Sequence, residues 1–229
     1  MFKTLRRKWL RERMSRQCNW EPMRELLLST PPDTRLSWKD TELLALDLET
    51  TGLDSRQHNI VSMGWVIIRD GVIQMDEAGH LVIQSGLPMN QSATIHGIFD
   101  SEIAQGISLE AALEELLGKL RGRVLVLHHA PLDIAFLNEA CKQACGQKLL
   151  VPTIDTMALE KSRLDRRDQP IKPGMLRLGA VRERYGLGQV RAHNALTDAL
   201  ATAELLLAII AHSESGGASL PLKRLLARH

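Results

Sequence analysis

The stretch LLALDLETTG, at residues 43–52, decides how the rest of the chain is interpreted. Its apolar run predicts a buried strand over Leu43–Leu48. Strand side chains alternate between two faces, so Asp47 and Glu49 share one face of this strand. The opposite face carries Leu44, Leu46 and Leu48. Because an unpaired buried charge costs several kcal/mol, two carboxylates here indicate a functional site rather than a solvated surface. Gly52 then permits a tight backbone turn close to a ligand.

The order of predicted elements indicates the fold class. Two further strands follow at Ile60–Ile68 and Val72–Ile83, and Asp70-Gly71 between them is a hairpin signal. The remaining elements are helices at about 98–105 and 109–121, a strand at Val124–His128, a helix from Pro131 to about Ala144, a strand near Val151–Ile154, and helices around Met157–Leu164, Met175–Tyr185 and 195–212. This order predicts an α/β domain with a mixed five-stranded sheet flanked by helices.

The chain divides into three predicted regions: a basic helical extension at 1–37, a compact domain at 38–213 and a short tail at 214–229. In the extension, near-helical spacing of apolar residues predicts a basic amphipathic helix over 3–16. The apolar positions are Phe2, Leu5, Trp9 and Met14, and we expect them to pack on the domain or on a partner. A second short helix is expected around Pro22–Leu28, before the boundary at Pro31-Pro32.

Composition excludes several classes of protein. With 229 residues, 44% of them apolar and 24% charged, the chain is an ordinary globular protein, not a disordered, collagenous or coiled-coil one. Three cysteines are too few for a disulfide framework, and Cys141 and Cys145 lack a second pair for zinc, so we expect a reducing, cytoplasmic location. The longest apolar run, Leu205–Ala211, is too short to cross a bilayer, so no membrane association is expected.

Positive charge is concentrated in two segments, although 29 basic against 27 acidic residues leave a net charge of only +2. Residues 1–20 hold seven basic residues against one acidic, and residues 161–191 hold nine against three. We interpret the second segment as a phosphate-binding surface. The alternative is a solvated helical surface.

Two more segments carry candidate site residues. Val124–Leu127 predicts a buried strand and Pro131 a helix start, so Asp133 lies in the first turn of the next helix. Favourable interaction with the helix dipole is an alternative role for this residue. Asn194 is a predicted N-cap, which places Asp198 in or just past the first turn of the last helix and His193 in the loop before it.

Four carboxylates from three separated segments converge only if cations hold them together, because such a cluster otherwise protonates or opens. Oxygen ligands favour Mg²⁺ or Mn²⁺ over zinc. Two such ions about 3.5–4 Å apart clamp the attacking and leaving oxygens of a phosphodiester. A loop histidine beside them is a candidate general base for the attacking water.

The three segments together resemble a known family. They are Asp47-Leu48-Glu49-Thr50-Thr51-Gly52, His128-His129-Ala130-Pro131-Leu132-Asp133 and His193-Asn194-Ala195-Leu196-Thr197-Asp198. Over about residues 40–212 the chain is similar to the DnaQ-like, DEDDh 3′–5′ exonucleases, which include the epsilon proofreading subunit of bacterial DNA polymerase III. The resemblance implies an RNase H-like fold, two divalent cations and release of 5′-mononucleotides from single-stranded or frayed 3′ ends of DNA, in repair or proofreading.

The resemblance also assigns roles to residues. The implied metal ligands are Asp47, Glu49, Asp133 and Asp198, with His193 as the general base. The implied substrate contacts are Thr50, Thr51, Gly52, Leu53 and His96, with Leu53 as a wedge beside the last base. The family usually carries Asn where His129 stands and Phe where Leu132 stands. Asp155 often has a counterpart in relatives, but helix capping explains it equally well.

Two alternative functions stay open. One is the same chemistry on RNA ends, as in RNase T and oligoribonuclease relatives, because the contact to a 2′-hydroxyl is local. The other is a non-catalytic nucleic-acid-binding or polymerase-associated module. The expected partners are nucleic acid 3′ ends, DNA favoured, and then a DNA polymerase, or a sliding clamp bound through Ser219-Leu220-Pro221-Leu222. The oligomeric state is left open.

Overall fold

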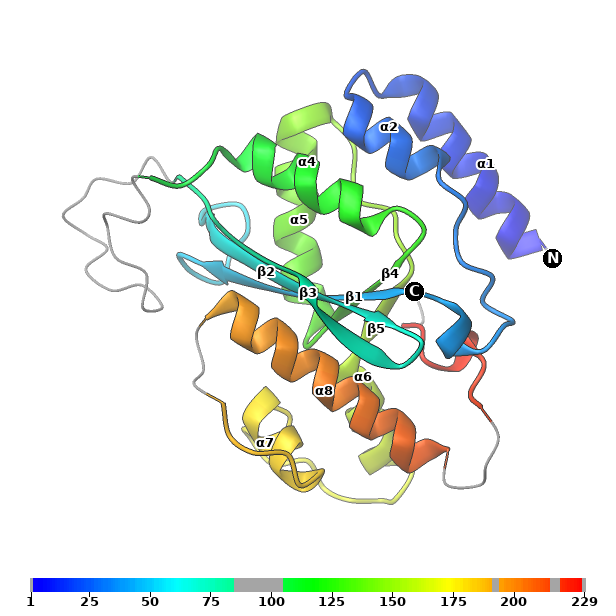
Figure 1. Ribbon diagram of the computed structural model, residues 1–229, viewed down its shortest axis with the longest axis vertical. Coiled ribbons are helices and arrows are strands. Elements are labelled where there is room, and N and C mark those ends of the chain that lie inside the picture. The colour runs from blue at the N-terminus through cyan, green and yellow to red at the C-terminus, as the bar shows by residue number, and fades with distance from the viewer. Residues whose placement is uncertain (1, 85–104, 191–193, 215–218, 228–229) are drawn as a thin grey trace.

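Figure 1 shows the computed structural model, which describes residues 2–84, 105–190, 194–214 and 219–227. In this described part of the chain, five strands form one sheet in the order β3-β2-β1-β4-β5. They are β1 (Leu43–Thr50), β2 (Ile60–Arg69), β3 (Val72–Val82), β4 (Val124–Leu127) and β5 (Thr153–Asp155). β1 runs antiparallel to β2 and parallel to β4. The predicted mixed five-stranded sheet is confirmed.

The β2–β3 hairpin turns where the sequence predicts. Asp70 has a φ of 54° and Gly71 a φ of 79°. Two consecutive residues in the left-handed region are what a type I′ turn requires, and this turn matches the twist of the flanking strands.

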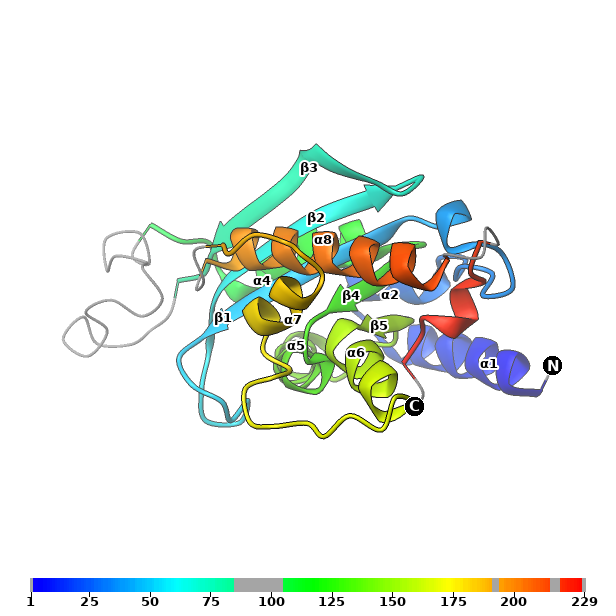
Figure 2. The same ribbon diagram turned by 90° about the horizontal axis from the view of Figure 1, so that it is seen from below.

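Helices cover both faces of the sheet, as Figures 1 and 2 show. They are α1 (Phe2–Gln17), α2 (Glu21–Leu28), α4 (Leu109–Leu120), α5 (Ala130–Cys145), α6 (Thr156–Asp165), α7 (Leu178–Arg184) and α8 (Ala195–Ser213), with short 3₁₀ turns η1 (Trp38–Asp40) and η2 (Leu222–Arg224). The predicted helix at 98–105 lies outside the described residues. The start predicted for α7 at Met175 is wrong, because residues 173–176 form a turn in which Gly174 has a φ of 83°.

The alternation of side chains along β1 separates two hydrophobic cores. Leu44, Leu46 and Leu48 pack in the core that contains α2, α4 and α5. Leu43 and Ala45 pack in the core that contains α8. Asp47 and Glu49 continue the second series, so both point to the face of the sheet that α8 covers.

The start of α8 is in direct contact with β2 at Gly64. A Cβ atom at Gly64 would lie 2.1 Å from the backbone nitrogen of Leu196 and 2.2 Å from the carbonyl carbon of Ala195. Gly64 is also opposite Asp47 in the register of β1 and β2. The absence of a side chain at this position therefore brings the first turn of α8 next to the acidic strand.

By length and composition alone, α8 is long and apolar enough to cross a membrane. Core helices pass the same test, and nine of its nineteen residues are buried. Ala203, Leu206 and Ile210 pack in the core beneath β1 and β2. The structure therefore gives α8 the position of a core helix.

The N-terminal helices form, but α1 presents an unexpected side chain to the rest of the protein. Trp9 is 58% exposed and stacks with the guanidinium of Arg13, 5.5 Å from the ring centre. Arg11 is buried instead and donates hydrogen bonds to the carbonyls of Leu26 and Leu27, at 2.5 and 3.0 Å. The expectation that the apolar residues of α1 pack on the domain is confirmed for Met14, which packs against the core, and is wrong for Trp9. Packing of Trp9 on a partner stays a prediction. Arg11 lies against α2 instead, because the unpaired carbonyls at the end of that helix need donors.

The C-terminal residues also pack on the domain. Leu222 is fully buried and Leu225 nearly so, both in the core beneath α8. Pro221 forms a bridge with Ser37. Because Leu222 is held in the core, residues 219–222 are not an accessible peptide for a sliding clamp. The region boundaries at residues 37 and 213 stay a prediction.

Gly64→Ala is expected to lower the free energy of unfolding by at least about 1–3 kcal/mol, the usual cost of overpacking. The added methyl group meets backbone atoms of α8, which cannot rotate away. Urea denaturation measures the change. Gly179→Ala is the matched control, because a Cβ there meets no atom within 4 Å and Gly179 lies in α7. Equal stability of the two variants would contradict the close approach of α8 to β2.

Candidate functional site

Carboxylates from β1 and α8 meet at one place. Carboxylate oxygens of Asp47, Glu49 and Asp198 all lie within 4.8 Å of one another. Asp198 is in the first turn of α8, and the cap that sets this turn is as predicted, because Asn194 accepts a hydrogen bond from the backbone of Thr197 at 3.1 Å. The structure therefore brings together three of the four carboxylates expected to converge.

Asp133 completes the acidic group from a third element. It is buried in the first turn of α5, directly after β4. Burial raises the pKa of Asp47 well above its usual range, and the charges of Asp133, Asp198 and Glu49 raise it further. The other three predicted carboxylates therefore all act electrostatically on Asp47.

The pKa of Asp133 is raised to about 7, first by burial and then by the nearby charges of Asp155 and Glu49. Such a carboxyl group tends to hold a proton at neutral pH unless a cation stabilises its charge. The acidic group therefore has the electrostatics of a cation site.

The donor set fits a hard divalent cation. Every candidate ligand is a carboxylate oxygen, the type that Mg²⁺ and Mn²⁺ prefer. The hydroxyl of Ser62, opposite Glu49 in the β-sheet register, is buried and has no hydrogen-bond partner among the described residues. A divalent cation would supply the positive charge that this group of carboxylates requires. Asp47, Glu49, Asp133 and Asp198 are therefore the residues that would hold it.

Asp155 fixes the helix that carries Asp133. Its Oδ1 atom accepts hydrogen bonds from the backbone of Met157 and Ala158, which caps α6. The same carboxylate accepts the backbone N–H groups of His129 and Ala130, both at 3.2 Å. The expected capping role of Asp155 is confirmed, and a second role is added: it ties the start of α5 to α6.

His129 occupies a strained backbone position, with a φ of 74°. Asn and His are among the side-chain-bearing residues that adopt this left-handed region most readily. The replacement of the family's usual Asn by His129 therefore keeps the turn that delivers Asp133.

The turn after β1 is packed against a histidine. A Cβ atom at Gly52 would lie 2.5 Å from the ring of His58, and Thr51 Oγ1 is 3.4 Å from His58 Nδ1. The Thr50 hydroxyl donates to the carbonyl of Gly52 at 2.7 Å. Leu53 is 79% exposed, as a side chain that meets a substrate must be. The predicted residues His96 and His193 lie outside the described residues.

Sequence reasoning missed Gly64, although a signal for it exists. An isolated glycine inside a strand often marks the close approach of another backbone, and Gly64 lies in the middle of β2. It also missed His128, whose Nε2 atom is 2.8 Å from the carbonyl of Leu176 and whose Nδ1 atom is 2.8 Å from Thr156 Oγ1. No local pattern predicts these two contacts.

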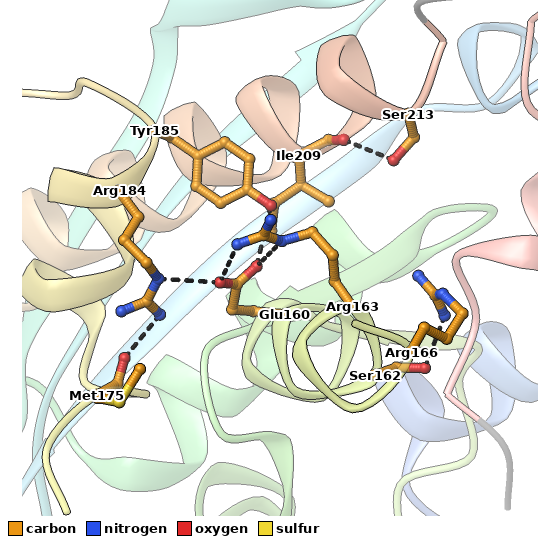
Figure 3. Close-up of polar contacts among 9 residues, drawn as sticks. All are labelled: Glu160, Ser162, Arg163, Arg166, Met175, Arg184, Tyr185, Ile209 and Ser213. Atoms are coloured by element: carbon orange, nitrogen blue, oxygen red, sulfur yellow. Dashed lines mark hydrogen bonds and ion pairs between the residues drawn. The ribbon is translucent and has the colours of Figure 1, made fainter. Parts of the chain in front are cut away.

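Part of the basic segment at 161–191 is structural. Figure 3 shows the fully buried Glu160 between Arg163 and Arg184, with a further hydrogen bond from Tyr185. Although burial opposes its charge, these hydrogen bonds hold the pKa of Glu160 below its usual range. Arg182 is buried as well and donates to the carbonyl of Ala201 at 2.8 Å. These three arginines are thus committed to partners within the fold.

Similar proteins include exonucleases and DNA polymerase III proteins. The family model described as Exonuclease matches residues 44–206, a range that contains all four carboxylates. The chain is 37% identical over 174 residues to the PolC-type DNA polymerase III of Thermotoga petrophila, covering 76% of this chain and 12% of that protein. It is 26% identical over 173 residues to the DNA polymerase III subunit epsilon of Aquifex aeolicus, covering 75% of this chain and 81% of that protein.

A solved structure shows the same fold. Exonuclease I from Methylocaldum szegediense superposes with a TM-score of 0.62 at 18% identity, over 76% of this chain and 41% of that one. The expected RNase H-like fold is confirmed. The chain spans only 12% of the length of the PolC-type relative, so the activity of that whole protein does not transfer to it directly.

Asp133→Asn is expected to flatten the pH dependence of stability in EDTA. The pKa of Asp133 is about 7 in the folded protein, against a usual value of 3.8. Between these values the folded protein holds a proton that the unfolded chain has released, so the free energy of unfolding falls as pH rises from about 4 to about 7. Urea denaturation across this range measures the slope, and Asp133→Asn should lose its own share of it.

Asp54→Asn is the control for this experiment. Asp54 is exposed, and its pKa is lowered, chiefly by a hydrogen bond from the backbone of Arg56, so it loses its proton below the tested range. This variant should keep the wild-type slope. Saturating Mg²⁺ should flatten the wild-type slope, because a cation favours the charged carboxylate. An Asp133→Asn slope equal to that of wild type would contradict the burial of this carboxyl group.

Proposed function

The chain belongs to the DnaQ-like exonuclease family, and on that premise we propose that it hydrolyses phosphodiester bonds at the 3′ ends of DNA and releases 5′-mononucleotides. The observation that carries the proposal is the meeting of Asp47, Glu49 and Asp198 within 4.8 Å, with Asp133 acting on the same group. Carboxylates gathered from three elements have no structural use that offsets their repulsion. They suit a cation-dependent reaction on a phosphate ester.

The residues divide the chemistry between them. Asp47, Glu49, Asp133 and Asp198 would hold two divalent cations, Mg²⁺ or Mn²⁺, and these would stabilise negative charge on the oxygens of the phosphodiester. His193 precedes the N-cap of α8 and takes the proton of the attacking water. Leu53 meets the last base, and Thr50, Thr51, Gly52 and His96 contact the terminal nucleotide.

DNA is the proposed substrate because both curated relatives compared above are DNA polymerase III proteins. The terminal nucleotide must reach carboxylates that are largely covered by the fold, so a single-stranded or frayed end fits better than a closed duplex. We place the activity in DNA replication or repair in the cytoplasm, with a DNA polymerase as a protein partner.

Asp47→Ala is expected to reduce nucleotide release from a 3′ end by at least about 10²-fold, the cost of removing one preorganised electrostatic group. The melting temperature should stay equal or rise, because the variant removes a buried carboxyl group that its neighbours repel. Gel analysis of a 5′-labelled oligonucleotide in Mg²⁺, together with thermal melting, measures both. Unchanged activity of Asp47→Ala would refute this site.

His193→Ala is expected to reduce the rate of nucleotide release by about 10²–10⁴-fold, the usual contribution of a general base. Cation binding, measured by calorimetry, should be retained in this variant.

Wild-type protein is expected to degrade single-stranded DNA from its 3′ end in Mg²⁺ or Mn²⁺ and to be inactive in EDTA. The test compares DNA and RNA of the same sequence, each labelled at the 5′ end, so that a ladder of shortened products reports the polarity. Faster degradation of RNA would replace the DNA assignment with an exoribonuclease. Binding of both without cleavage would indicate a non-catalytic module.

A further inference from the structure

A hollow of about 370 Å³ lies beside α6 and the segment that leads to α7. Its apolar lining includes Met157, Ile171 and Leu176, and its charged lining is Lys172 and Arg177. We name it the 171–177 hollow. It is shallow and open to solvent, and it combines aliphatic and cationic groups.

The two cations of the hollow are available to a ligand. Lys172 and Arg177 are exposed, and neither forms an ion pair within the described residues. Other basic residues of this segment are already engaged: Lys161 pairs with Asp165 at 2.8 Å, and two arginines are held by the buried carboxylate of Glu160. Lys172 and Arg177 are therefore two of the cations in this segment that have no carboxylate partner among the described residues, and both line the hollow.

The wall of the hollow is held in place from two sides. His128 Nε2 donates to the carbonyl of Leu176 at 2.8 Å. Arg184, which also bonds the buried Glu160, donates to the carbonyl of Met175 at 2.7 Å, as Figure 3 shows. A wall fixed in this way loses little entropy when a ligand binds, which is how a preorganised site gains affinity.

The segment that lines the hollow is bonded to the end of the sheet that carries the acidic group. Val126 pairs with Ala45 in the parallel register of β4 and β1. His128 and Asp47 each come two residues later, so both stand at the same end of the sheet. The His128 side chain bonds directly to Leu176, which lines the hollow. One side chain therefore links the hollow to this end of the sheet.

We propose that the 171–177 hollow binds a nucleotide of the substrate strand on the 5′ side of the scissile bond. Lys172 and Arg177 neutralise its phosphate, and the aliphatic lining contacts its base or sugar. The inference rests on the proposed function, because that function places the terminal nucleotide at the carboxylates and leaves the next part of the strand to be held nearby. Cations on a backbone phosphate give affinity without sequence preference, as an exonuclease requires.

The test compares Lys172→Gln/Arg177→Gln with the control Lys223→Gln/Arg224→Gln. Both double variants remove one lysine and one arginine charge from exposed positions, but the control residues lie outside the segment 161–191 and do not line the hollow. The substrates are the p-nitrophenyl ester of thymidine 5′-monophosphate, which has no upstream nucleotide, and single-stranded oligodeoxynucleotides of two to ten nucleotides.

For the hollow variant we expect KM for the ten-nucleotide substrate to rise about tenfold, with hydrolysis of the ester unchanged. The slope of log KM against log salt concentration should become shallower by about 0.7 for each phosphate that the variant no longer neutralises. The control variant should keep the wild-type KM and slope. A hollow variant that matches the control on the ten-nucleotide substrate, or one that loses ester hydrolysis as well, would overturn the proposal.

Binding distinguishes failure of this inference from failure of the proposed function. Fluorescence anisotropy of the labelled ten-nucleotide strand is measured in EDTA, where no hydrolysis is expected. If wild type hydrolyses neither substrate but the hollow variant alone loses binding, the hollow is a nucleic-acid site and the proposed function is wrong. If wild type hydrolyses both and binding is equal in all three proteins, the function stands and the hollow proposal is wrong.

Discussion

The constraint on which this structure depends is the confinement of like charges at the end of β1. Asp47, Glu49 and Asp198 would separate if their own interactions decided their positions. Neutral backbone features hold them instead: the pairing of β1 with both neighbours, and the contact of α8 with Gly64. Asp155 does the same for Asp133, because its carboxylate accepts backbone N–H groups from the start of both α5 and α6. Backbone pairing and helix packing thus offset the repulsion between the carboxylates, and the site is arranged before any cation binds.

Local patterns predicted those parts of the site that local chemistry determines. The alternation of a strand places Asp47 and Glu49 on one face, and the N-cap at Asn194 places Asp198 in a first turn. The alternation does not reveal which element covers that face. The contact between Gly64 and α8 joins residues more than a hundred positions apart, and it depends on how closely two backbones approach. The assignment of His96 rests on resemblance alone, whereas that of His193 rests also on its place just before the N-cap of α8, and both residues lie outside the described part of the chain.

Counting charges identified the basic segment at 161–191, but it could not tell which of its basic side chains form hydrogen bonds inside the fold and which face solvent. Arg184 bonds Glu160 across 24 positions, and Arg182 bonds the carbonyl of Ala201 across 19. A cation that is buried by a distant acceptor looks identical in sequence to one that faces solvent. The same reason explains α1, where the amphipathic pattern predicted that Trp9 packs on the domain or on a partner, and the structure leaves Trp9 exposed and buries Arg11. Trp9 is more hydrophobic than Arg11, so hydrophobicity favours burial of the tryptophan. This comparison leaves out the carbonyls at the end of α2, which require hydrogen-bond donors.

The hydrogen bonds of the buried Arg11 side chain have a consequence for the order in which the parts of the protein fold. Besides its bonds to α2, this guanidinium donates to the carbonyl of Leu150 at 3.1 Å, a partner 139 positions further along the chain. During translation, at about 5–20 residues per second, that carbonyl emerges on the order of ten seconds after α1. Although α1 leaves the ribosome before the other described helices, it therefore docks fully only after Leu150 has emerged, and until then its partly desolvated cation has an incomplete set of acceptors. Nascent chains of this protein pass through an interval in which α1 and α2 are formed but not yet locked to the sheet.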